Sequence, residues 1–62
     1  MNEAEIAEAR RRWLDGASED LVRELRRVRQ RAEHRGESAV SESLVSLEVL
    51  VERVFRAHRE EG

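Results

Sequence analysis

The stretch from Ser38 to Arg59 constrains the fold more than any other part of the chain. Its apolar residues are spaced alternately four and three apart, which is the heptad pattern of a long amphipathic helix. The stretch contains neither Pro nor Gly and is far too long for a strand. The heptad stripe consists of Val40, Leu44, Leu47, Val51, Val54 and His58, with Leu50 and Phe55 at its edges.

The segment before this stretch begins with helix signals of its own. Asn2 and Glu5 have the spacing of an N-terminal capping box, which predicts a helix start at the second or third residue. The pair Asp15-Gly16 is typical of a helix end, because glycine adopts the left-handed conformation that closes many helices. A first helix is therefore expected over about residues 3–15.

The next segment predicts a second helix with a narrow apolar stripe. Ser18 is an expected N-cap, Gly36 an expected helix end, and Ser38 the expected cap of the third helix. Connections of about three residues make neighbouring helices antiparallel. The fold class predicted is all-α, a three-helix up-down-up antiparallel bundle with helices at about 3–15, 19–35 and 38–60.

A bundle of this kind needs a central core, and the apolar stripes of the three segments supply one. Trp13 is the largest apolar side chain, so Trp13→Ala is expected to cost about 3 kcal/mol or more. The predicted core residues are Ile6, Trp13, Leu21, Leu25, Val28, Leu44, Leu47, Val51, Val54 and Phe55.

Length and composition limit the chain to a single domain covering residues 1–62. There is no Cys, which rules out disulfides and thiolate metal sites. Charged residues make up 42% of the chain, yet the apolar residues keep their period, unlike those of a disordered tail. No apolar run is long enough to span a membrane and no signal-peptide pattern is present, so a soluble protein is expected, in an unassigned compartment.

All 12 basic side chains are Arg, and six of them lie in the predicted second helix. A solvated charged face is the favoured interpretation, because Glu and Asp interleave with the Arg residues and allow i,i+4 pairs. Contact with an acidic protein is an alternative. Nucleic-acid binding is disfavoured, since no aromatic residue is interspersed for base stacking.

The sequence shows no arrangement typical of catalysis, of a cofactor or of a metal. His34 and His58 are expected at opposite ends of the bundle, so they cannot share a metal ion. No glycine-rich phosphate loop occurs, and the serines lack a His and Asp to activate them. The chain is therefore predicted to be non-enzymatic, with no cofactor and no metal.

Val45 and Val49 stand on the polar side of the last predicted helix, roughly opposite the heptad stripe. Val has modest helix propensity and gains nothing in solvent, so this pair needs an explanation. Three explanations remain: an unused rim, self-association, or a docking protein partner. Ser43 and Ser46, with Ala39 and Ala57, form an edge of small residues beside the stripe. Such an edge would allow either close internal packing or close approach of a partner.

The chain resembles de novo designed three-helix mini-proteins, especially binders, in its loops at Asp15-Gly16-Ala17 and Arg35-Gly36-Glu37 and in its caps. This resemblance implies a protein-binding module that presents the outer face of its third helix to a protein partner. Alternatives are a self-associating homodimeric unit, or a small natural interaction protein from a G+C-rich genome, which would explain the absence of Lys. The predicted partner-binding residues are Ser41, Glu42, Val45, Glu48, Val49, Glu52 and Arg56.

Overall fold

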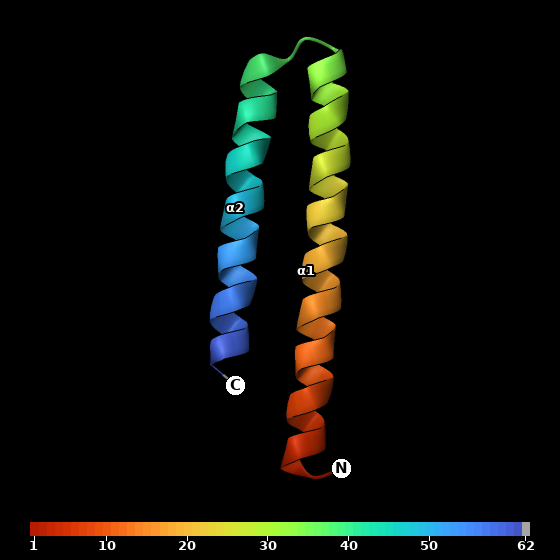
Figure 1. Cartoon of the computed structure of the whole chain (residues 1–62), viewed down its shortest axis with the longest axis vertical. Helices are drawn as coiled ribbons and strands as arrows, with labels where there is room; N and C mark the ends of the chain where they lie inside the picture. The colour runs from red at the N-terminus through yellow and green to blue at the C-terminus, as the bar shows by residue number, and fades with distance from the viewer. Residues whose placement is uncertain (62) are drawn as a thin grey trace.

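The computed structural model describes residues 1–61 and contains two α-helices rather than three (Figure 1). Helix α1 spans Glu3–His34 and helix α2 spans Ser38–Glu60. The two run antiparallel and are joined by a tight turn. The prediction of an all-α chain agrees with this structure. The predicted three-helix bundle with helices at about 3–15, 19–35 and 38–60 is wrong, because the first two helices are one.

Gly16 is the residue at which the prediction failed. It lies inside α1, and a glycine in a helix interior costs only about 1 kcal/mol relative to Ala. Leu14 and Val22, on either side of it, are both buried. Continuing the helix through Gly16 keeps both side chains directed at α2, which offsets the cost of the glycine. Ser18 consequently does not cap a helix and lies half-buried within α1.

Gly36 behaves as predicted and ends the first helix. Its φ of 74° is in the left-handed region, where a side chain would be strained. The Gly36 amide donates to the Glu33 carbonyl at 3.1 Å, and the Glu37 amide donates to the Ala32 carbonyl at 2.9 Å. These bonds satisfy carbonyls at the end of α1 and reverse the chain.

The helix starts are only partly as predicted. The Glu5 amide donates to Asn2 Oδ1 at 2.8 Å, which confirms Asn2 as the cap of α1. Asn2 Nδ2 in turn donates to Glu5 Oε1 at 3.3 Å. Ser38, the predicted cap, is instead the first residue of α2, and Glu37 occupies the cap position without a side-chain capping bond.

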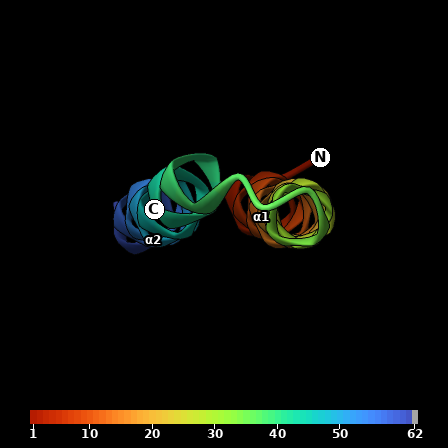
Figure 2. The same cartoon turned by 90° about the horizontal axis from the view of Figure 1, so that it is seen from above.

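The hairpin is a single flat layer, as the view along the helices shows (Figure 2). The Cα trace measures 51 × 16 × 7 Å along its principal axes. Helix α1 is longer than α2 by nine residues and projects beyond the C-terminus (Figure 1). Because a single layer has two open faces, the hairpin leaves a large share of its side chains uncovered.

The core between the helices is small. Among residues 1–61, only Leu14, Val22 and Ala32 are buried hydrophobic residues, and no side chain there is completely buried. Four of the predicted core residues lie half-buried along the helix contact: Leu25, Leu44, Val51 and Phe55. The other six are exposed, which corrects the predicted core, since no third helix covers them: Ile6, Trp13, Leu21, Val28, Leu47 and Val54.

Candidate association surface

The exposed large apolar side chains gather on one side of the hairpin, which we call the apolar face. At about 100° per residue, helix geometry turns these residues to the same side of the contact line between α1 and α2. Trp13 of α1 and Val54 of α2 accordingly line one shallow pocket together with Phe55. The apolar face consists of Ile6, Trp13, Leu21 and Val28 from α1 and of Val40, Leu47, Leu50 and Val54 from α2.

The opposite side, which we call the polar face, is held together by ion pairs. Glu48 accepts hydrogen bonds from Arg29 Nε at 2.8 Å and from Arg26 Nε at 3.2 Å. Arg29 also donates to Glu33 at 3.1 Å. The hydrogen bond with Glu48, followed by that with Glu33, raises the pKa of the Arg29 guanidinium above its ordinary value. Charges on this face are therefore paired across the two helices.

The two central residues of the predicted binding surface lie on the polar face. Val45 is 47% exposed and Val49 is 45% exposed. They line a shallow groove between the helices, with Arg26 and Arg29 on its far side. Glu52 also borders this groove and lies 4.0 Å from Arg26. The structure thus brings three charged side chains together around the two valines: Arg26 and Arg29 of α1 and Glu52 of α2.

The remaining predicted site residues divide between the interior and the surface. Ser41 and Glu48 are each only 8% exposed and lie between the helices rather than on an outer rim. The Ser41 hydroxyl donates to Glu33 Oε1 at 3.2 Å, which ties the start of α2 to the end of α1. Glu42 and Arg56 are exposed. Two polar side chains assigned to binding therefore serve the helix contact.

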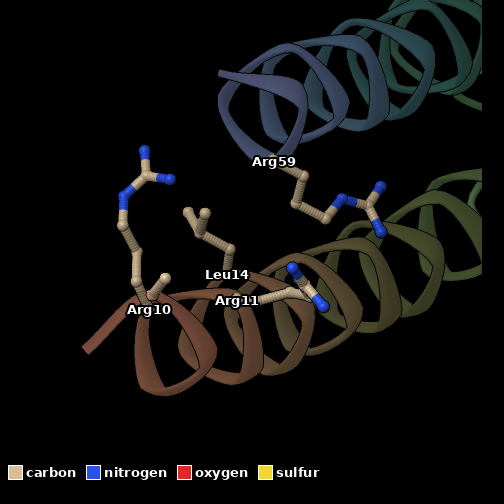
Figure 3. A pocket seen from close by; sticks show the side chains of 5 residues that line it. Arg10, Arg11, Leu14 and Arg59 are labelled. Carbon is tan, nitrogen blue, oxygen red and sulfur yellow. The ribbon is translucent and has the colours of Figure 1, made fainter. Parts of the chain in front are cut away.

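At the open end of the hairpin, arginines fasten α2 onto α1. Arg59 donates to Asp15 at 2.8 Å, and Arg10 donates to the His58 carbonyl at 3.1 Å. Figure 3 shows the Leu14 side chain between Arg10 and Arg59, in a pocket that Arg11 also lines. These contacts fix the register of the helices, and the start of α1 extends beyond the end of α2 (Figure 1).

Sequence reasoning did not identify the apolar face as a surface. The signal was the width of the stripes: Leu47 and Val54 were assigned to a core that a third helix would close. With Gly16 inside α1, no such helix exists, and the same residues become exposed. The failure to identify this surface and the wrong prediction of a third helix are thus a single error.

Sites of other kinds are not seen in the part of the chain that the structure describes. Among residues 1–61, no three His, Cys, Asp or Glu side chains come together as metal ligands. Within the same residues, neither helix is apolar enough over a sufficient length to cross a membrane. His34 ends α1 beside the turn, whereas His58 lies in the last turn of α2, at the opposite end of the hairpin.

Comparisons with protein-family models, with curated proteins and with solved structures found no match to this chain. The resemblance to designed binders accordingly stays a prediction as far as origin is concerned. The description of function rests on the geometry of the two faces.

Proposed function

We propose that the chain is a non-enzymatic association module in which two copies pair through their apolar faces. The observation that carries this proposal is the one-sided distribution of exposed apolar residues. Eight of the eleven large exposed hydrophobic residues belong to the apolar face. Contiguous apolar surface of this kind marks association sites in soluble proteins, whereas isolated exposed apolar residues need no explanation.

The accessible area supports one further layer of protein on this face. The chain has an accessible surface of 5051 Å². A compact monomer of its mass is expected to have about 4,100 Å² by the usual scaling with molecular weight. The excess of about 900 Å² matches the roughly 800 Å² that each partner contributes to a standard interface.

The small core also supports coupled folding and association. Single cores in chains below about 70–80 residues rarely supply more than 3–5 kcal/mol. The described part of this hairpin has only three buried hydrophobic residues. Burying the apolar face against a second hairpin would extend the core to both layers, and in many obligate dimers the monomer is not stable alone.

A second candidate function is binding of a different protein at the groove around Val45 and Val49. The groove joins an apolar floor to arginine and glutamate side chains from both helices, a combination suited to a polar-rimmed contact. It is smaller than the apolar face, and its charges already pair with one another. For these reasons we rank it below self-association.

Sedimentation equilibrium of the full chain at micromolar concentrations tests the proposal. The expected mass is twice the monomer mass of 7.2 kDa, with a shift toward monomer on dilution. A matched pair of variants separates the two faces: Leu21→Glu with Val28→Glu, and Val45→Glu with Val49→Glu. The first pair should give monomers and the second should keep the dimer. A monomer at every concentration overturns the proposal, and loss of the dimer only in the second pair moves the contact to the groove.

A further inference from the structure

We infer that the second copy docks in a symmetric antiparallel arrangement, in which the two α1 helices run in opposite directions and cross at Ala17. This inference rests on the proposed self-association and adds the arrangement of the partner. It comes from a row of residues on α1 that faces away from the contact with α2 by about a quarter turn. The row consists of Glu3, Ile6, Arg10, Trp13, Ala17, Leu21, Glu24, Val28 and Arg31.

The spacing of this row is symmetric about Ala17. Reading outward in either direction, the steps are four, three, four and three residues. Such spacing is the heptad seam of a coiled coil, and its centre falls on the smallest side chain of the row. Two antiparallel copies can therefore meet with Ala17 against Ala17, where small side chains allow the backbones to approach closely.

Antiparallel pairing matches apolar residues on both sides of this centre. Trp13 of one copy meets Leu21 of the other, and Ile6 meets Val28. All four side chains are exposed in the single hairpin, Trp13 most of all at 67%. The pairing would cover a large aromatic side chain that nothing in its own chain covers, and buried aromatic residues often dominate the energy of interfaces.

The charged residues of the row distinguish the two possible directions. Antiparallel pairing sets Arg10 opposite Glu24 and Glu3 opposite Arg31, which brings opposite charges together. Parallel pairing in register would set each of these residues opposite its own copy, so that like charges meet. Like charges across a seam disfavour an arrangement, and opposite charges there select partner and orientation.

The unequal lengths of the helices give an independent reason for the same arrangement. Arg10 contacts the carbonyl of His58, so the part of α1 before Arg10 extends past the last full turn of α2. Ile6 lies in this projecting segment and is exposed. In an antiparallel pair, the projecting segment lies beside Val28 of the partner, along the half of the partner's α1 that is nearer the turn. In a parallel pair, the two projecting segments would have only each other.

Cross-linking tests the direction, since the chain contains no native cysteine. Chains carrying Ile6→Cys are mixed with chains carrying Val28→Cys and treated with a short bismaleimide. The expected product is a covalent dimer containing one chain of each kind. Ile6→Cys chains alone should not cross-link, because residues 6 of the two copies would be about 33 Å apart along the helix axis. A Val45→Cys chain replaces the Val28→Cys chain as the matched control and should give no product.

The outcomes separate this inference from the proposed function. If sedimentation shows a dimer but Ile6→Cys chains cross-link to themselves, the copies are parallel and the inference is overturned while self-association stands. If sedimentation shows only monomers, the proposed function itself fails. A dimer in which neither pair cross-links also overturns the inference, because it removes the contact at Ile6.

A charge exchange provides a second readout that does not depend on cysteine chemistry. Glu24→Arg should weaken association at least several-fold, because it sets two arginines opposite each other at two places in the seam. Adding Arg10→Glu in the same chain should restore most of the affinity. Equal affinities of the single and double variants would contradict the antiparallel seam.

Discussion

The two faces of this hairpin contain apolar residues in different surroundings. On the polar face, Val45 and Val49 lie beside a network in which Glu48 bridges Arg26 and Arg29. On the apolar face, exposed apolar residues such as Trp13 and Leu21 recur along both helices, with Arg10 and Glu24 spaced between them on α1. The difference indicates that an exposed apolar residue marks a binding surface when many such residues share one face, and not through its exposure alone.

Val45 and Val49 have a different significance in the two-helix structure than in the predicted bundle. From the sequence, Val45 and Val49 were the unexplained residues, because the heptad stripe was assigned to a core. In the two-helix structure Val40, Leu47 and Val54 of the stripe are exposed. The valine pair is a smaller feature on the side closed by ion pairs. Five predictions test how far the two faces differ and how the hairpin is held together.

The largest difference is expected when glutamates replace apolar residues on each face in turn. Leu21→Glu with Val28→Glu should weaken self-association at least 100-fold, because about 3 kcal/mol or more of apolar burial is lost and charges enter the interface. Val45→Glu with Val49→Glu should change it only a few-fold. Both affinities are measured by sedimentation equilibrium. Equal losses in the two variants would erase the distinction between the faces.

The next effect concerns Trp13, whose burial depends on association. Trp13→Ala should lower stability by about 3 kcal/mol at concentrations where the dimer is populated. At concentrations low enough for monomers, the same change should have little effect, since the side chain is 67% exposed in the hairpin. Chemical denaturation at two protein concentrations measures both values. A concentration-independent loss would place Trp13 within the core of the single chain.

A smaller effect is expected from the ion pairs of the polar face. Glu48→Gln should lower stability modestly, because Arg26 and Arg29 lose their shared charged acceptor. The loss should shrink in high salt, which screens such pairs, and dimer affinity should stay within a few-fold. Thermal melts at low and high salt provide the test, and a collapse of the dimer would assign these residues to the interface.

The same ion pairs predict no loss of the Arg29 charge near neutral pH. The pKa of Arg29 is raised by its bonds with Glu48 and Glu33. A raised pKa contributes stability that is present below the unfolded pKa and is lost only as the pH rises through the folded value. For arginine that window lies at extreme alkaline pH, so the contribution from Arg29 stays constant across the neutral range.

The smallest effect is expected at Gly16 and has the opposite sign. Gly16→Ala should stabilise the protein by about 0.5–1 kcal/mol, because Gly16 is helical and a Cβ there would meet no atom within 4 Å. Gly36→Ala serves as the contrast and should destabilise, since its φ is 74°. Thermal melts compare the two, and destabilisation by Gly16→Ala would restore the predicted helix break there.

These two glycines show how much of the fold could be predicted from the sequence. Gly36 lies where the apolar residues change from one stripe to another, and the turn was predicted correctly. Gly16 has similar local signals, with Asp15 before it and Ser18 after it, but Leu14 and Val22 share one face of an uninterrupted helix. Local cap preferences are worth about 1 kcal/mol, and packing against α2 outweighs them.

The functional surface could be predicted only in part for the same reason. The heptad stripe of α2 was identified correctly as apolar, and its period alone could not show whether a third helix covers it. Glu48 was predicted to bind a partner, yet it lies in the helix contact with two arginines from α1. Interhelical pairing of that kind depends on register, which single-helix patterns do not contain.

The central claim is that pairing of the apolar faces stabilises the folded hairpin. Its most direct test is the thermal melting of the unmodified chain, followed by circular dichroism over a hundredfold range of protein concentration. The account predicts that helicity and melting temperature both rise with concentration, because the second copy stabilises the folded state by mass action. A melting curve that is the same at every concentration would contradict it.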